Sequence, residues 1–209
     1  TKLVEERLAE IFEVSRPRIR EVLARLAHEQ IVELFPQRGA YVAKPTIEQA
    51  MHVFEARRLI EPAVLRRLIE NLSPERVARL RHHCELEQDA RRRDDKRSVV
   101  RLSGEFHILL AELCGNEQLS RLLRGLLTRS TMHFSLSAPE RFHNCAGPHD
   151  HADIVKAILA RDAKKAAKLM LDHLLGLVEW QSAWQAPPDP VALEDAFRGI
   201  SAKRQASRS

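Results

Sequence analysis

The chain has 209 residues and a formal net charge of +5, and 44% of its residues are hydrophobic although only 5% are aromatic. Few glycines and abundant Leu, Ala, Arg and Glu are typical of a mainly α-helical protein, and no apolar run approaches membrane-spanning length, so we expect no membrane partner. Cys84, Cys114 and Cys145 lie far apart with no CxxC spacing, which predicts neither a disulfide framework nor a cysteine zinc site and favours a reducing cytoplasm.

A short amphipathic helix is predicted first, with Leu3, Leu8, Ile11 and Phe12 on its apolar side. Residues 13–14 would form the turn after it. The second helix is predicted to begin after Ser15, because serine is a good N-cap and Pro17 then lies in the first turn, where a missing N–H costs nothing. Its buried face follows the spacing i, i+3, i+4, i+7, with the residues Ile19, Val22, Leu23 and Leu26.

Three arginines, Arg16, Arg18 and Arg20, lie at the N-terminus of this second helix. Free backbone N–H groups and cationic side chains can both meet phosphate there, and arginine can also reach a guanine edge. Residues 1–45 hold eight Lys or Arg and seven Asp or Glu, so attraction to DNA has to come from these clustered arginines and Arg38. This is the layout of a recognition helix.

A β-hairpin is predicted next, from the apolar runs 31–35 and 40–42. Pro36 and Gly39 supply the fixed and the positive φ that the turn between them needs, and Arg38 lies at its tip. The order of helix, turn, helix and hairpin predicts a winged helix-turn-helix. The alternative is a small helical bundle with a solvated arginine face, but cap, arginines and hairpin follow the order of the DNA-binding motif.

A second domain is predicted after residues 44–46, because Pro45 disfavours helix before it and Thr46 can cap the helix that follows. From there the pattern is an all-α helical bundle. We expect a DNA-binding domain at residues 1–45, an effector and dimerisation domain at 46–184 and a flexible tail at 185–209. The helices are predicted at residues 47–71, 74–93, 99–114, 118–135, 151–159 and 163–184, with a loop at 139–148.

Three of the ten histidines are candidates for a metal site. His107 lies near an apolar helix face. His151 is ten or eleven residues before a turn at 161–162 and His173 eleven or twelve after it, so the two can face each other across an antiparallel helix pair. The other seven are predicted to be ordinary surface or packing residues: His28, His52, His82, His83, His133, His143 and His149.

Residues 8–43, LAEIFEVSRPRIREVLARLAHEQIVELFPQRGAYVA, resemble the DNA-binding domain of the GntR family of bacterial transcription regulators. The resemblance implies operator contacts by Arg16, Arg20, Arg38 and Gly39, with Arg18 between them. Two positions depart from the family pattern. Gln30 replaces a helix-ending glycine, and Glu6 stands where some members carry a DNA-contacting arginine, for which Arg7 is a weak substitute. The family's additional N-terminal helix is missing, so we expect native residues before Thr1.

The segments EARRLIE, EFHILLAELCGNEQL and HADIVKAILARDAKKAAKLMLDHL resemble the FCD type of C-terminal effector domain. That resemblance implies a divalent metal, zinc or similar, held by His107, His151 and His173, with a small carboxylate effector completing the coordination. Ser103 replaces the aspartate of the family's D-x-x-x-H pair, which weakens the expectation of a metal, and it would face the pocket as a hydrogen-bond partner. Arg58 matches a common arginine that can bind the effector carboxylate.

These patterns predict a homodimeric transcription regulator that binds double-stranded operator DNA and senses a small organic acid through a metal. We do not expect an enzyme, because the sequence has no HExxH or nucleophile motif. Two alternatives remain open. One is a metal-independent helical sensor of an apolar or bulky acid, and the other is a histidine-metal hydrolase. For Arg58, a structural ion pair with a nearby acid is an equally good interpretation.

Overall fold

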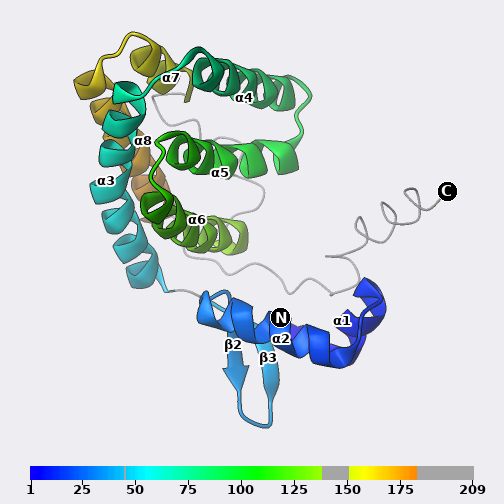
Figure 1. The fold of residues 1–209 in the computed structure, drawn as a ribbon. Helices are drawn as coiled ribbons and strands as arrows, with labels where there is room; N and C mark the ends of the chain where they lie inside the picture. Colours follow the sequence, from blue (N-terminus) through cyan, green and yellow to red (C-terminus); the bar gives the residue numbers. More distant parts are fainter. Residues whose placement is uncertain (45, 138–150, 183–209) are drawn as a thin grey trace, which may run out of the picture. The chain divides into compact units, whose positions relative to one another are not determined.

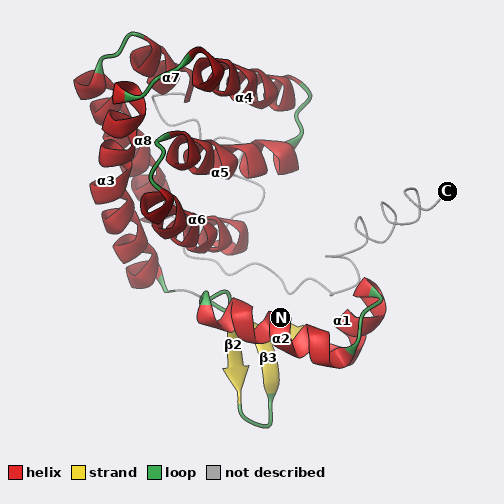
Figure 2. Cartoon of the chain, in the orientation of Figure 1, coloured by secondary structure: helices red, strands yellow, loops and turns green. Residues whose placement is uncertain are grey.

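The computed structural model describes residues 1–44, 46–137 and 151–182 (Figure 1). These residues divide into two compact units, one of residues 1–44 and one formed from residue 46 onward. Helices predominate beside one small sheet (Figure 2), so the predicted fold class is confirmed. The predicted loop at 139–148 and tail at 185–209 lie outside the described residues.

The first unit combines two helices with a three-stranded antiparallel sheet. Helix α1 spans Glu5–Phe12 and α2 spans Arg16–His28. Strands β2 (Val32–Phe35) and β3 (Gly39–Val42) form the predicted hairpin, and β1 (Lys2–Leu3) pairs with the other side of β3. The strand order is therefore β1-β3-β2, with β3 in the centre.

The hairpin register fixes the wing turn. Val32 pairs with Val42 and Phe35 with Gly39, so residues 36–38 form the tip. Gly39 has a φ of 91°, as its predicted role in the turn requires, and Gln37 supplies a second positive φ of 62°. An edge-to-face contact between Phe35 and Tyr41, with ring centroids 5.6 Å apart, packs the two strands together.

Two local predictions in this unit are wrong, those for Leu3 and Val22, and the predicted N-cap Ser15 is confirmed in position alone. Leu3 lies in β1 opposite Ala40 and not in the first helix; it precedes Leu8 by five residues, which is not a helical repeat. Ser15 occupies the N-cap position of α2, but its side chain accepts no capping hydrogen bond. Pro17 is at N2 and has no N–H, so one of the two usual donors to a cap is absent. Val22 is exposed, and the core of this unit consists of Leu3, Leu8, Ile19, Leu23, Val32 and Ala40.

The second unit contains six described helices. Helix α5 lies between α4 and α6, and α3 packs along α8 and against α6 (Figure 1). The short helix α7 packs on α8 and α4. Their bounds are α3 Ile47–Glu70, α4 Pro74–Arg92, α5 Lys96–Leu113, α6 Glu117–Ser137, α7 His151–Leu159 and α8 Ala163–Ser182.

Side-chain caps explain where most of these helices begin. Thr46 forms a capping box with Gln49, in which each side chain bonds the other's backbone N–H, as its predicted capping role requires. Four further side chains accept hydrogen bonds from first-turn N–H groups of α4, α5, α6 and α8, and they are Ser73, Asp95, Asn116 and Asp162. Local chemistry therefore fixes the start of α3, α4, α5, α6 and α8 before tertiary packing is considered.

Phe54 on α3 is completely buried in the core of the second unit. Truncation to alanine should lower the free energy of unfolding by about 3–5 kcal/mol, because it removes the ring's transfer free energy and leaves a cavity. Chemical denaturation followed by circular dichroism measures this loss.

Leu59 on the same helix is the matched control, because 76% of it is exposed. Leu59→Ala should change the free energy of unfolding by less than about 0.5 kcal/mol. Equal losses in the two variants would contradict the core assignment.

Candidate functional site

The three arginines at the N-terminus of α2, Arg16, Arg18 and Arg20, are all exposed and all ion-paired within the first unit. Arg16 Nη1 lies 2.6 Å from Glu6 Oε1, and Arg20 Nε lies 2.7 Å from Glu5 Oε2. Arg18 pairs with Glu21 of its own helix. Residues four apart share a helix face, so Arg16 and Arg20 form one group beside α1, and Arg18 points to a different side.

The wing tip places Arg38 and Gly39 together, as the hairpin predicted. Arg38 is exposed, and its backbone N–H donates to the carbonyl of Phe35 across the turn. The φ of 91° at Gly39 belongs to a region that side chains rarely adopt, so any substitution there strains the turn. An exposed guanidinium on a rigid turn is suited to contact a DNA backbone.

The three predicted histidines come together inside the second unit. His107 of α5, His151 of α7 and His173 of α8 are all buried, and one ligand nitrogen from each lies within 4.8 Å of the others. The Nε2 atoms of His151 and His173 are 3.3 Å apart, which agrees with the predicted equal height of the two residues across the α7–α8 turn. Phe106 stacks on His151 with ring centroids 4.0 Å apart.

Two buried glutamates orient two of these imidazoles. Glu61 Oε2 lies 2.6 Å from Nδ1 of His107, and Glu87 Oε1 lies 2.7 Å from Nδ1 of His151. A carboxylate can only accept, so each Nδ1 carries a proton, and in a neutral ring this leaves the lone pair on Nε2. Carboxylate–histidine pairs of this kind fix the tautomer and ring orientation of metal-binding histidines.

The donor set fits a divalent metal ion. Zn–N distances of about 2.0–2.1 Å place two imidazole nitrogens on one tetrahedral ion roughly 3.3 Å apart. The Nε2 atoms of His151 and His173 have this spacing, and a ring nitrogen of His107 lies within 4.8 Å of the ligand nitrogens of both. Three neutral imidazoles are a common zinc-binding set that leaves a position for a further ligand.

The buried arginine of this region is Arg57, not the predicted Arg58. Arg57 is 2% exposed; its Nε donates to Glu61 over 2.7 Å, and its Nη1 donates to Ser130 of α6 over 3.1 Å. Arg58 is only half-buried, because adjacent helical residues point about 100° apart. The second terminal nitrogen of Arg57, Nη2, is buried and makes no hydrogen bond among the described residues.

The electrostatics of the site follow from this pairing. Burial alone would raise the pKa of Glu61, but the Arg57 guanidinium and the His107 imidazole together lower it to about 2. Burial likewise opposes ionisation of Glu87, yet His151 and His83 lower its pKa to about 2. Burial lowers the pKa of His107 to about 4, so this ring is neutral and able to bind a metal near pH 7.

Several residues of this network were not predicted from the sequence. His83, expected to be ordinary, is buried; its Nε2 lies 3.0 Å from the carbonyl of Leu102, and it approaches Glu87. The spacing of His83 in the sequence could have indicated its burial. His83 and Glu87 lie four residues apart on the buried face of α4, as Arg57 and Glu61 do on α3. Charged residues on an otherwise apolar stripe require partners. Ser103 is half-buried one turn before His107.

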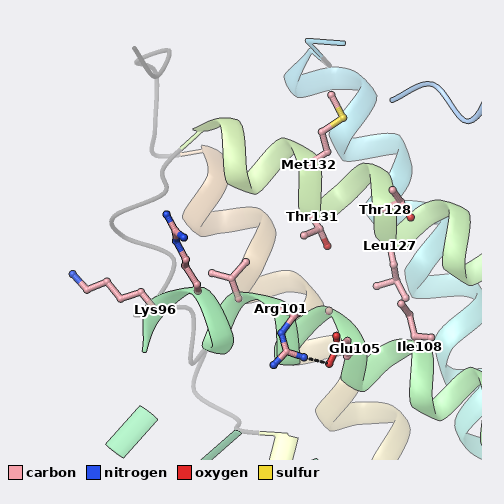
Figure 3. A pocket seen from close by; sticks show the side chains of 11 residues that line it. Lys96, Arg101, Glu105, Ile108, Leu127, Thr128, Thr131 and Met132 are labelled. Carbon is pink, nitrogen blue, oxygen red and sulfur yellow. Dashed lines mark hydrogen bonds and ion pairs between the residues drawn. The ribbon is translucent and has the colours of Figure 1, made fainter. Parts of the chain in front are cut away.

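A separate cavity of about 570 Å³ lies between α5 and α6 (Figure 3). Its described lining contains no histidine and combines apolar walls with three basic side chains. Arg101 is held by Glu105 over 2.7 Å, as the dashed line in Figure 3 marks. The basic and the larger apolar residues of the lining are Lys96, Arg97, Val100, Arg101, Ile108, Leu127 and Met132.

The low pKa of His107 predicts acid destabilisation of the metal-stripped protein. In the unfolded chain His107 binds a proton near pH 6.5, whereas in the folded chain it does so near pH 4. The neutral His107 therefore contributes roughly 3 kcal/mol to the free energy of unfolding. This contribution is complete above pH 6.5 and is lost as the pH falls to 4. The pKa values of Glu61 and Glu87 fall from 4.5 to about 2, so their contributions are lost only below pH 4.5.

Denaturation in the presence of a chelator, between pH 7 and pH 4, measures this loss, and His107→Gln should remove most of it above pH 4.5. His82→Gln is the control, because His82 is exposed. The raised pKa of His83 makes the folded protein more stable as the pH falls, which opposes the effect of His107. This effect is the same in the wild type, His107→Gln and His82→Gln. Equal pH dependence in the wild type and His107→Gln would show that His107 is not held neutral.

Comparison with known proteins assigns both units. The FCD domain family matches residues 52–176, and the gntR family of bacterial regulatory proteins matches residues 1–42. The HTH-type transcriptional repressor RspR of Escherichia coli K12 is 27% identical over 184 residues, which cover 86% of this chain and 78% of RspR. The HTH-type transcriptional repressor NanR of Salmonella newport is 28% identical over 191 residues, which cover 81% of this chain and 72% of NanR.

Solved structures show the same fold. Escherichia coli McbR/YncC superposes with a TM-score of 0.77 at 18% identity, over 88% of this chain and 87% of that protein. A putative GntR regulator from Rhodococcus sp. RHA1 gives a TM-score of 0.74 at 22% identity, over 87% of both chains. Among the described residues, none of the helices combines the length and the hydropathy needed to cross a bilayer.

A chain that joins these two domains is a DNA-binding transcription regulator. The α1–α2 pair with its wing is the matched gntR domain, and the bundle that holds the histidine cluster is the matched FCD domain. The protein thus belongs to the GntR family of bacterial regulatory proteins, in the branch that carries a C-terminal FCD domain.

Proposed function

We propose that this regulator senses a small organic acid through a divalent metal ion bound by His107, His151 and His173, and that it acts in the cytoplasm as a homodimer on operator DNA. The observation that carries the proposal is the convergence of three buried imidazoles, two of them oriented by buried carboxylates. A carboxylate that accepts a hydrogen bond from an imidazole is typical beside metal-binding histidines, and such a pair is costly to bury for packing alone.

A bound divalent ion would act as a Lewis acid that accepts a carboxylate oxygen of the effector. The three imidazoles are neutral ligands, so they leave the full charge of the ion uncompensated. Ser103 stands one turn before His107, where the family pattern has an aspartate, and a hydroxyl adds no negative charge. The chemistry of this donor set therefore favours an anionic ligand in the remaining position.

Arg57 gives independent support for an anion. Its guanidinium is buried, is shared between Glu61 and Ser130, and keeps an Nη2 group without a hydrogen-bond acceptor among the described residues. A buried donor without an acceptor costs free energy that a bound carboxylate would recover. We therefore add Arg57 to the proposed effector-binding residues Arg58 and Ser103.

A histidine-metal hydrolase is less well supported than a sensor. Hydrolysis needs a general base whose pKa lies near the working pH. Both glutamates beside the described histidines have pKa values of about 2 and already accept hydrogen bonds from imidazole N–H groups. They are suited to orient ligands and not to remove a proton from water.

The cavity between α5 and α6 favours one alternative, a metal-independent sensor of a bulky or apolar acid. Val100, Ile108, Leu127 and Met132 would contact the apolar part of such a ligand, and the basic side chains Lys96, Arg97 and Arg101 its charge. The two proposals predict different ligands. A small carboxylate suits the histidine cluster, whereas an acid with a long apolar chain suits this cavity.

On the DNA side, we propose that Arg16 and Arg20 read bases, that Arg18, Arg38 and Gly39 contact the backbone, and that two copies bind a palindromic operator. One unit of 44 residues offers few base contacts, and a two-fold dimer doubles them. The four arginines of this proposal, Arg16, Arg18, Arg20 and Arg38, are exposed in the first unit, so their side chains are accessible to DNA.

Arg16→Ala and Arg20→Ala should each weaken binding to the operator by about 1–3 kcal/mol, because each removes a base contact from an exposed helix. Binding is measured by fluorescence anisotropy on a duplex selected from a random pool by the wild type. Arg25→Ala is the control, because Arg25 is exposed near the other end of α2. Unchanged affinity in both Arg16 and Arg20 variants would refute the recognition-helix assignment, and a monomeric mass by light scattering would refute the dimer.

The double variant His151→Ala, His173→Ala should lose both the metal and the response to small carboxylates, because it removes two of the three ligands. Wild-type protein should carry about one divalent ion per chain by mass spectrometry of its metal content. Thermal stabilisation by a panel of small carboxylates should then require the metal.

The control is the double variant His52→Ala, His82→Ala, which removes two exposed histidines. If the His151/His173 variant keeps both metal and response, the metal-sensor proposal fails. Stabilisation of that variant by long-chain acids alone would support the cavity between α5 and α6 instead.

A further inference from the structure

The two glutamates of α1 contact the recognition arginines in different ways. Glu5 Oε2 accepts from Nε of Arg20 over 2.7 Å and lies 3.8 Å from Nη2 of Arg16. Glu6 Oε1 accepts from the terminal Nη1 of Arg16 over 2.6 Å. The glutamates also differ in exposure, since 30% of the Glu5 side chain is exposed and 67% of the Glu6 side chain. Glu5 is thus hydrogen-bonded to Arg20 and makes only a longer ion pair with Arg16, whereas Glu6 is hydrogen-bonded to Arg16.

The bond from Glu5 leaves the reading end of Arg20 available. A guanidinium has one N–H on Nε and two on each terminal nitrogen, and its two terminal nitrogens can bind O6 and N7 of guanine together. Occupation of Nε by a carboxylate fixes the orientation of the guanidinium plane without using this fork. The arginine then loses less conformational freedom when it binds a base.

The bond from Glu6 has the opposite effect. It occupies Nη1 of Arg16, one of the two donors that a base or a phosphate would take. Its exposed carboxylate also adds a negative charge beside an approaching polyanion, which weakens phosphate contacts at every sequence. Glu6 therefore competes with DNA for one of the N–H groups of Nη1 and for the charge of the Arg16 guanidinium.

We propose that Glu5 is a positioning residue that orients Arg20 for base recognition, and that Glu6 masks Arg16 and lowers affinity for non-operator DNA. The proposal rests on the proposed role of α2 as the recognition helix. It assigns opposite effects to two adjacent carboxylates: Glu5 increases the preference for operator sequence, and Glu6 decreases affinity for DNA of any sequence.

The test compares Glu5→Ala, Glu6→Ala and the control Glu29→Ala in the full-length protein. Glu29 also pairs with an arginine of α2, but at the C-terminal end of that helix. The probes are the duplex selected from a random pool by the wild type and a duplex of the same length with that sequence shuffled. Affinity for each is measured by fluorescence anisotropy at several salt concentrations, and melting followed by circular dichroism checks folding.

Glu5→Ala should lower the affinity for the selected duplex about 10-fold and change the affinity for the shuffled duplex little, so the ratio of the two falls. Glu6→Ala should raise the affinity for the shuffled duplex about 3- to 10-fold and make its salt dependence steeper by about one ion per site. Glu5→Gln keeps an oxygen acceptor without the charge and should recover part of the lost preference. Glu29→Ala should leave both affinities unchanged.

A positioning role also requires dependence on Arg20. In an Arg20→Ala background, Glu5→Ala should have no further effect on the ratio of affinities. If Glu5→Ala lowers that ratio equally with and without Arg20, or lowers both affinities together, the positioning role is wrong. If Arg20→Ala itself leaves the selected duplex tightly bound, the recognition-helix proposal fails instead. Unchanged affinity of Glu6→Ala for the shuffled duplex would overturn the masking role.

Discussion

The second unit depends on the pairing of the charged and polar groups that its helices bury. Arg57, Glu61 and Glu87 are all nearly inaccessible to water, and each is compensated by a polar group from a different helix. Removal of one partner from a buried pair typically costs about 3–5 kcal/mol, because the other charge is left unpaired. Every helix from α3 to α8 contributes to this network, through the residues Arg57, Glu61, His83, Glu87, His107, Ser130, His151 and His173. The alignment of the six helices is therefore constrained by charge as well as by apolar packing.

The sequence was sufficient to predict the elements of the fold, because their signals are local. Apolar spacing and breakers placed α7 at 151–159 without error, and the end of α3 within one residue. Caps such as Thr46 and Asn116 act through their own neighbours and need no tertiary context. The start of α5 was placed three residues late, because its first residues, Lys96 and Arg97, lie in a charged run that resembles a loop.

The parts that could not be predicted depend on contacts between distant residues. Strand β1 forms only because β3 offers a free edge to it, and two residues carry no periodicity of their own. The choice between Arg57 and Arg58 depends on which side of α3 meets α6, which a family pattern of adjacent arginines does not specify. His151 and His173 could be paired from the helical turn between them, whereas Glu61 and Glu87 lie 46 and 64 residues from their imidazole partners. Spacing rules do not reach across such separations.

Two of the three convergent histidines lie on one helical hairpin. His151 opens α7, His173 lies within α8, and residues 160–162 join the two helices in a tight turn closed by backbone hydrogen bonds. The two histidines therefore share one helical hairpin, whereas His107 belongs to a separate helix, α5. On the α5 side, His107 is tied by Glu61 to α3, the helix that follows directly after residue 45 in the chain. Through this single hydrogen bond, the first helix of the bundle sets the orientation of an imidazole that lies on another helix.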